Sequence, residues 1–159
     1  MIPSDTVYIM GGGHVSKELA LLTKQVGFKT LVFDDREEFA NKARFPDIEG
    51  VFICSDFSKV FEDFNITPGG YVVIVTRGHR FDKEVFASAL KTNAEYIGMI
   101  GSRKKRQYTY QSLIAEGYQQ SDLDRVYCPI GLSINAETPA EIGVSIVAQL
   151  VQHRANTNF

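Results

Sequence analysis

The stretch of sequence that decides the fold is residues 6–16, which read TVYIMGGGHVS. Its first part, residues 6–10, is a continuous apolar run, which is typical of a strand buried on both faces of a parallel sheet. The glycines that follow permit a tight turn, and beyond the turn Val15, Leu19 and Leu22 recur at helical spacing. A buried strand, a glycine turn and a helix in this order predict the start of a βαβ unit.

Similar apolar runs along the chain predict further strands. They are residues 30–33, 51–54, 71–76 and 96–100, with a weaker sixth run at residues 125–128. Segments of helical spacing separate these runs, although the crossover between the third and fourth strands is expected to be abbreviated. Strands that alternate with helices in this way predict an α/β fold built on an open, doubly wound and mostly parallel sheet of about six strands.

The last helix is the best marked of those that the sequence predicts. It begins with Thr138-Pro139-Ala140-Glu141, which combines an N-cap, a proline at the first helical position and a capping-box glutamate. Two other predicted helices cover residues 84–90 and a stretch after Gly101. Residues 154–159 are polar and are expected to fray.

Length and composition limit the classes of protein to which the chain can belong. The chain has 159 residues, of which 44% are hydrophobic and 23% charged. A chain of this length buries about 70% of the surface that it exposes when unfolded, which is enough for one core. We therefore predict a single domain over residues 1–159, with an ordered core from about residue 5 to about residue 153.

Charge, hydropathy and cysteine content exclude several partners and sites. A formal net charge of −2 gives no overall basic field for nucleic acid or anionic lipid. The chain has no apolar run long enough to span a membrane, and residues 1–5 lack the features of a signal peptide, so a cytoplasmic protein is expected. Cys54 and Cys128 lie far apart without a Cys/His cluster, so neither a disulfide framework nor a metal site is predicted.

The glycine turn is a candidate phosphate-binding loop. Gly11, Gly13 and Ser16 stand at the three glycine positions of a G-x-G-x-x-G pattern, with serine in place of the third glycine. Such a turn lets the backbone approach a pyrophosphate that lies on the helix N-terminus. The alternative is a glycine turn that serves only a sharp reversal of the chain. The candidate binding residues of this loop are Gly11, Gly12, Gly13, His14 and Val15. His14 is expected beside the phosphate or as a cap of the turn.

Two carboxylates follow the second predicted strand. Asp34 and Asp35 stand where a carboxylate can accept hydrogen bonds from a ribose diol. Asp34 would favour NAD through the 2′-hydroxyl, whereas Arg36 would suit a 2′-phosphate. The alternative is an acidic pair that only caps the next helix.

Two basic loops are expected beside the glycine loop. After the fourth predicted strand the chain reads Thr76-Arg77-Gly78-His79, and after the fifth it reads Gly101-Ser102-Arg103. Because ligands of open α/β sheets bind outside the carboxyl ends of the strands, both loops are candidate anion-binding elements. Ser102 as an N-cap would open a second helix N-terminus suited to an anion. Residues 104–106 are expected to form a solvated helix face.

Charge is distributed unevenly along the chain. Residues 77–106 carry eight cationic and three anionic side chains, a net charge of +5, so the remaining residues carry −7. The cationic stretch includes both basic loops, which favours a small anionic, nucleotide-like ligand. His79 would donate to a phosphate, shuttle a proton, or do neither, since spacing does not decide its role.

Short motifs in order along the chain resemble those of the XdhC/CoxI family, specifically its C-terminal Rossmann-like domain. They are residues 11–16 (GGGHVS), 33–36 (FDDR), 76–80 (TRGHR), 96–103 (YIGMIGSR), 129–132 (PIGL) and 137–142 (ETPAEI). The resemblance extends from about residue 5 to about residue 151 and implies a Rossmann-like fold. Ser133 and Asn135 depart from the family's pattern, in which Asp and Gly follow the Gly-Leu step.

The resemblance also implies a function. Members of this family are accessory proteins of xanthine dehydrogenase, so a role in the maturation of molybdenum hydroxylases is implied. The implied cargo is molybdenum cofactor, as molybdopterin or its dinucleotide, which would be bound for sulfuration and insertion. The implied partners are a molybdenum hydroxylase apoenzyme and a sulfurase. The glycine loop, Asp34, residues 76–80 and residues 101–103 would line the pocket.

Two other functions fit the same residues. The glycine pattern and Asp34 fit an NAD(P)-dependent oxidoreductase or a nicotinamide-sensing module. A third possibility is a scaffold with a vestigial pocket that acts through protein contacts, a homodimer among them. The sequence has no G-x-x-x-x-G-K-[ST], H-E-x-x-H or G-x-S-x-G motif, so no catalytic residue is predicted. A non-enzymatic, cofactor-binding chaperone is the expected class.

Overall fold

A parallel sheet organises the structure, a computed structural model that describes residues 5–157 apart from the side chain of His79. In these residues five strands form one sheet in the order β3-β2-β1-β4-β5. The strands are β1 (Thr6–Met10), β2 (Lys29–Asp34), β3 (Gly50–Ile53), β4 (Tyr71–Ile74) and β5 (Tyr96–Met99). The order reverses between β1 and β4, so the predicted doubly wound, Rossmann-like sheet is confirmed.

The weakest predicted strand, residues 125–128, does not join the sheet as a strand. Tyr127 forms an isolated parallel bridge with Gly98. A regular parallel pairing would next need the backbone N–H of residue 129 to donate to the carbonyl of Met99, but Pro129 has no N–H. The amide of Ile130 donates to that carbonyl instead, one residue out of register. The described sheet therefore has five strands, where about six were predicted.

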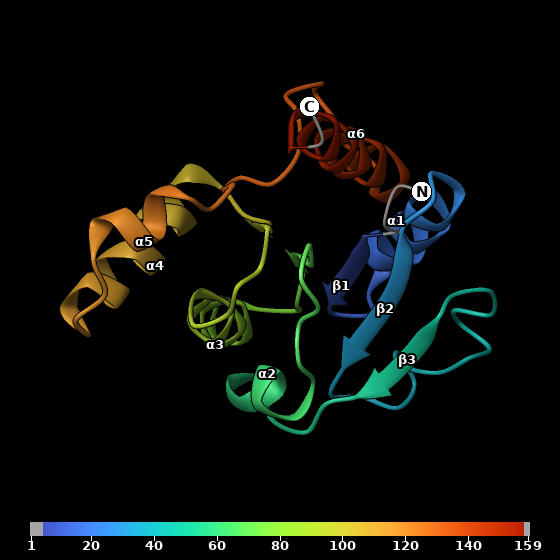
Figure 1. Cartoon of the computed structure of the whole chain (residues 1–159), viewed down its shortest axis with the longest axis horizontal. Coiled ribbons are helices and arrows are strands. Elements are labelled where there is room, and N and C mark those ends of the chain that lie inside the picture. The colour runs from blue at the N-terminus through green and yellow to red at the C-terminus, as the bar shows by residue number, and fades with distance from the viewer. Residues whose placement is uncertain (1–4, 158–159) are drawn as a thin grey trace.

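Helices cover both faces of the sheet (Figure 1). They are α1 (His14–Gln25), η1 (Phe57–Lys59, a 3-10 helix), α2 (Val60–Asp63), α3 (His79–Leu90), α4 (Arg103–Ala115), α5 (Gln120–Asp124) and α6 (Pro139–Thr157). Val7 and Ile9 of β1 join the core that includes α1 and α6. Tyr8 and Met10 of the same strand join the core that includes α3 and α4. Burial on both faces explains why the strand reads as a continuous apolar run.

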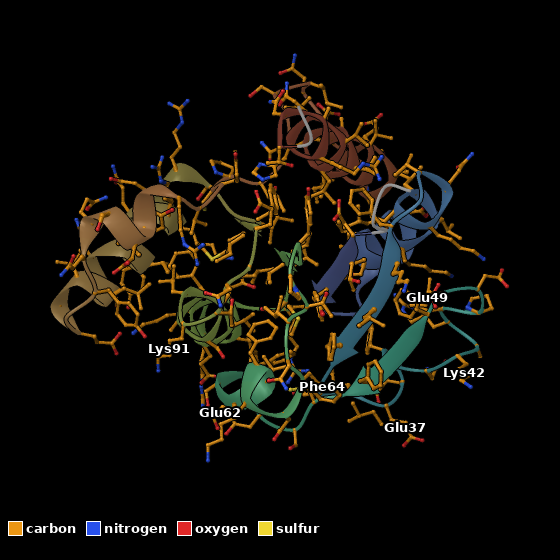
Figure 2. The ribbon with its side chains drawn as sticks, viewed as in Figure 1. Glu37, Lys42, Glu49, Glu62, Phe64 and Lys91 are labelled. Atoms are coloured by element: carbon orange, nitrogen blue, oxygen red, sulfur yellow. The ribbon has the colours of Figure 1, made fainter. Side chains whose placement is uncertain are left out.

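The crossover between β3 and β4 is short, as predicted. It consists of η1 and α2. Phe64 follows α2 and packs against Phe33 and Phe52, with ring centroids 5.0 Å apart in both pairs (Figure 2). These aromatic contacts hold the crossover on β2 and β3 without a longer helix.

Contacts fix both ends of α6. The Thr138 hydroxyl accepts the amide of Glu141 at 3.1 Å, and the Glu141 carboxylate accepts the amide of Thr138 at 3.1 Å, so the predicted capping box is confirmed. At the other end Arg154 donates to the carbonyl of Val26 at 3.1 Å. The helix therefore continues to Thr157, beyond the predicted end of the ordered core.

Other boundaries differ less from the prediction. α3 begins at His79 rather than at Glu84, because extended Gly78 serves as its N-cap. Residues 1–4 and residues 158–159, the last two of the predicted frayed tail, lie outside the described residues. Of the helices described, none has the length and apolar character needed to cross a membrane.

Candidate functional site

The parallel sheet brings the predicted loops to one edge. Each loop follows the carboxyl end of a strand, and β1 lies between β2 and β4 with β5 beyond β4. Hydrogen bonds join the loops to one another: Gly12 to Asp34, and Arg77 to Asp35. These loops lie at the carboxyl ends of the strands, beside the point between β1 and β4 where the strand order reverses. Ligands of open α/β sheets bind at this place.

Gly11 begins the glycine loop and is held against β4. Its φ is +115°, and a Cβ there would lie 2.4 Å from the carbonyl oxygen of Val75. The hydroxyl of Ser16 donates to the carbonyl of Gly11 at 2.5 Å. The serine that replaces the third glycine of the pattern is therefore small enough to pack beneath the turn, and it also closes the turn by a hydrogen bond.

The next two glycines have different surroundings. A Cβ on Gly12 would lie 2.4 Å from the carbonyl oxygen of Phe39, whereas a Cβ on Gly13 would meet nothing within 4 Å. Gly13 is the N-cap of α1, and no side chain caps the helix there. His14 begins α1 and is exposed, and Val15 is half-buried against the core. The open backbone at Gly13 is therefore the part of this loop that can receive an anion.

Asp34 is buried and bonded within the chain. Its carboxylate accepts the amide of Gly12 at 2.8 Å, the amide of Arg36 at 3.0 Å and the Arg36 guanidinium Nε at 3.0 Å. Burial alone would raise the pKa of Asp34, but the hydrogen bonds from Arg36 and Gly12 outweigh burial and hold that pKa below its ordinary value. The carboxylate predicted to bind a ribose is thus ionised and already supplied with donors.

Residues 36–45, which we call the cover segment, lie over the glycine loop from the β2 side. The guanidinium carbon of Arg36 is 3.7 Å from the ring centroid of Phe39. Arg44 donates from Nε to the carbonyl of Gly12 at 2.7 Å. The cover segment therefore holds Gly12 through its carbonyl, while the Phe39 backbone fills the space beside it.

Asp35 and Arg77 form an ion pair between two of the predicted loops. Arg77 donates from Nη1 and Nη2 to the two oxygens of Asp35, each at 2.8 Å. Because β1 lies between the strands that carry them, this pair spans the edge above the glycine loop. Asp35 and Arg77 are about one-fifth and one-third exposed in their side chains, at 20% and 37%. The pair is accessible to a competing anion.

A buried ion pair, Asp82 with Lys105, joins the two basic loops. Asp82 accepts the amide of Thr76 at 3.0 Å and also the Thr76 hydroxyl and the Lys105 ammonium. Lys105 donates in addition to the carbonyl of Ile100 at 3.0 Å. Burial raises the pKa of Asp82 above its ordinary value, against the hydrogen bonds from Lys105 and Thr76 that lower it.

The sequence-based interpretation of residues 104–106 as a solvated face is wrong for Lys105. Its side chain is 11% exposed, whereas Lys104 and Arg106 are exposed as predicted. Asp82 was not among the candidate residues at all. The two partners are 23 residues apart and on different helices, so no spacing rule pairs them.

A cavity of about 530 Å³ lies beside the second basic loop. Ser102 accepts the amide of Lys105 at 3.2 Å, so its predicted role as the N-cap of α4 is confirmed. The first amides of α4 have no acceptor within the helix, and Arg103 lines the cavity beside them. Residues 129–136 form another wall of the cavity, and the sequence placed them among the motifs but not among the site residues.

The wall formed by residues 129–136 is fixed on α6. Gly131 donates to Gln149 Oε1 at 3.0 Å, and its carbonyl accepts Gln149 Nε2 at 3.2 Å. Its φ is +97°, and a Cβ there would lie 2.2 Å from the Ser145 hydroxyl oxygen. Ser133 and Asn135, which depart from the family pattern, line the cavity.

The sequence also singled out His79, Cys54 and Cys128. The side chain of His79 lies outside the described residues, so its role stays a prediction. Cys54 and Cys128 are both free and buried, and burial raises the pKa of each thiol. Within residues 5–157, no group of three or more His, Cys, Asp or Glu side chains is placed to hold a metal ion.

Known proteins resemble this chain in sequence and in structure. The family described as the XdhC Rossmann domain matches residues 7–150. YqeB of Escherichia coli is 29% identical over 148 residues, which is 93% of this chain and 27% of YqeB. A Bacillus subtilis protein, named as a probable xanthine dehydrogenase subunit, is 28% identical over 152 residues, which is 96% of this chain and 44% of that protein.

One solved structure is also similar over almost the whole chain. It is described as a xanthine dehydrogenase from Bacillus halodurans, and it is 34% identical with a TM-score of 0.84. The match covers 97% of this chain and 44% of that one. The chain thus spans less than half the length of each of these three relatives.

Proposed function

The chain belongs to the XdhC family, whose Rossmann domain it matches from residue 7 to residue 150, and from that premise we propose that it binds an anionic cofactor during maturation of a molybdenum hydroxylase. The cargo would be molybdenum cofactor, either as molybdopterin or as its dinucleotide. The names of the relatives support an enzyme of the xanthine dehydrogenase type as the client. The chain would act as a chaperone rather than as an enzyme.

The observation that carries the proposal is the pairing of two helix N-termini at one sheet edge. The amide end of α1 is open at Gly13, and the amide end of α4 opens beside Arg103 and a cavity of about 530 Å³. Helix N-termini and arginine suit phosphate groups. Molybdopterin carries a phosphate and its dinucleotide a pyrophosphate, so the donor set fits the anionic end of the cargo.

Binding of a nicotinamide dinucleotide is the less favoured candidate. It would need Asp34 to accept a ribose diol, yet Asp34 already accepts hydrogen bonds from Gly12 and Arg36. It would also need space beside Gly12, which the Phe39 carbonyl fills. A nicotinamide dinucleotide is therefore included in the test as a competing ligand.

Calorimetry with the purified chain tests the proposal. We expect molybdenum cofactor released from a donor enzyme to bind the wild-type chain and the Gly13→Ser variant, but not the Gly13→Asp variant. Serine and aspartate both cap a helix and both fit the open space at this position, so only the carboxylate adds repulsion toward an anion. Tight binding of NAD(P), with no binding of molybdenum cofactor, would contradict the proposal.

The partners follow from the same proposal. A molybdenum hydroxylase apoenzyme and a sulfurase would exchange the cargo with this chain, whether it acts alone or as a homodimer. Activation of a purified apoenzyme by the cofactor-loaded chain measures this step. Equal activation by free cofactor at the same concentration would count against a chaperone role.

A further inference from the structure

Arg36 stands where the fold offers a binding place for a nucleotide ribose. In sheets of this kind the carboxylate at the end of the second strand accepts hydrogen bonds from the ribose hydroxyls. Here the guanidinium of Arg36 donates to that carboxylate, from Nε to Asp34 Oδ1 at 3.0 Å and from Nη2 to Oδ2 at 3.2 Å. Two N–H groups of the protein thus occupy both oxygens that a diol would use.

The same side chain also fills the neighbouring space. Its guanidinium carbon lies 3.7 Å from the ring centroid of Phe39, and the carbonyl of Phe39 lies 2.4 Å from the position of a Cβ on Gly12. Arg44 holds the cover segment in place through the carbonyl of Gly12 at 2.7 Å. The cover segment therefore occupies the space through which a ligand on the glycine loop would reach Asp34.

We propose that Arg36 determines specificity by excluding a ribose from Asp34, so that the glycine loop accepts a phosphate that has no ribose diol beside it. This assignment deepens the proposed function and rests on it, since it takes the glycine loop as the anion site. For the proposed cargo, it selects molybdopterin, which ends in its phosphate, over a form that binds through a nucleotide ribose.

Removal of the guanidinium should convert Asp34 into a ribose acceptor. Without the Arg36 side chain, the carboxylate keeps the backbone amides of Gly12 and of residue 36 as donors, at 2.8 Å and 3.0 Å, so it stays held in place. Two of its acceptor positions become free. The stacking contact that holds Phe39 over the loop is lost at the same time.

Calorimetry with three probes tests the assignment: inorganic pyrophosphate, ADP and 2′,3′-dideoxy-ADP. In the wild-type chain, ADP and its dideoxy analogue are expected to bind alike, because no hydroxyl reaches Asp34. In Arg36→Ala, ADP should bind at least about tenfold more tightly than the dideoxy analogue, as expected for hydrogen bonds to a charged acceptor. Arg36→Gln, whose shorter side chain cannot bridge both oxygens, should change affinity in the same direction by a smaller factor.

Lys42→Ala is the matched control. Lys42 belongs to the same cover segment and carries the same charge, but it is exposed and points away from the sheet (Figure 2). This variant should bind the three probes as the wild-type chain does. Circular dichroism and thermal melting of each variant verify that the fold is retained.

Two results would overturn the assignment. One is a wild-type preference for ADP over the dideoxy analogue, which would mean that Asp34 already accepts hydrogen bonds from the ribose hydroxyls. The other is a folded Arg36→Ala or Arg36→Gln variant with no such preference. Failure of pyrophosphate to bind the wild-type chain would instead contradict the anion site of the proposed function and the assignment with it, whereas either of the two results above, with pyrophosphate bound, would overturn the role of Arg36 alone.

Discussion

At the scale of the residue, three adjacent glycines have three different constraints. Gly11 needs a left-handed backbone and faces the Val75 carbonyl, and Gly12 faces the Phe39 carbonyl, whereas Gly13 faces open space. The first two are therefore required by the fold. The third has neither constraint, so the fold leaves room for a side chain there, and the role of Gly13 in the fold is that of the N-cap of α1.

Alanine substitutions separate these roles. Gly12→Ala should lower the free energy of unfolding by about 1 to 3 kcal/mol, because the new methyl group meets a backbone oxygen that cannot move freely. Gly13→Ala should change it by less than about 1 kcal/mol, since a helix N-cap only loses a favoured residue type. Urea denaturation measures both. Equal losses in the two variants would contradict the distinction.

Asp34 should make stability depend on pH in acid. Because its pKa in the folded chain lies below its ordinary value, the carboxylate stabilises the fold above that ordinary value. This contribution is lost as the pH falls through the lowered pKa. Asp34→Asn should therefore be less stable than the wild-type chain at neutral pH, and its free energy of unfolding should fall less steeply toward low pH. Parallel curves from urea denaturation at several pH values would exclude this role.

At the scale of the element, one buried ion pair joins the ends of β4 and β5. Asp82 lies in the first turn of α3 and Lys105 in the first turn of α4, so the pair fixes the two helix N-termini relative to each other. Thr76 is bound by the same carboxylate. The geometry of both basic loops thus depends on this side-chain contact between α3 and α4.

Loss of one partner should be costly. Lys105→Met leaves Asp82 buried without its cation and should lower the free energy of unfolding by about 3 kcal/mol or more. The double variant Lys105→Met with Asp82→Leu should recover part of that loss, because no unpaired charge remains. Lys104→Met, on the exposed face of the same turn, is the control and should change stability by no more than about 0.5 kcal/mol. A Lys105→Met variant as stable as this control would show that the pair does not hold the loops.

At the scale of the whole molecule, part of the uneven charge lies in the loops after β4 and β5. Residues 77–106 carry +5 in a chain of net charge −2, and they include the loops after β4 and β5. The overall charge therefore says little about the field at this sheet edge. At the edge itself, Arg77 is paired with Asp35 and Lys105 with Asp82, whereas Arg103 lines the cavity where a small anion would bind.

Affinity for pyrophosphate should fall as salt is raised from about 0.1 M to about 1 M, over which the screening length shrinks from about 10 Å to about 3 Å. Arg103→Gln should weaken this dependence. Lys91→Gln should not, because Lys91 is the C-cap of α3, at the opposite end of that helix from the loop that follows β4. A dependence that is the same in both variants would mean that binding responds to net charge rather than to Arg103.

Much of this architecture could be predicted from sequence because its causes are local. Continuous apolar runs indicate strands that are buried on both faces of a sheet. The capping box depends only on four consecutive residues, Thr138 to Glu141. Contacts between distant residues could not be predicted in this way. Two examples are the ion pair of Asp82 with Lys105 and the hydrogen bond from Arg44 to the carbonyl of Gly12. Both depend on which loops the sheet brings together. The lost sixth strand depends on a single missing N–H at Pro129.

The two buried cysteines have a practical consequence for work on this chain. Burial raises the pKa of Cys54 and of Cys128, so neither offers much thiolate to a maleimide at neutral pH. A cysteine introduced at the exposed position of Lys42 would be the preferred point of attachment for a fluorophore. Such a label, carried on the cover segment, would give an optical signal of any movement above Gly12 when an anion arrives.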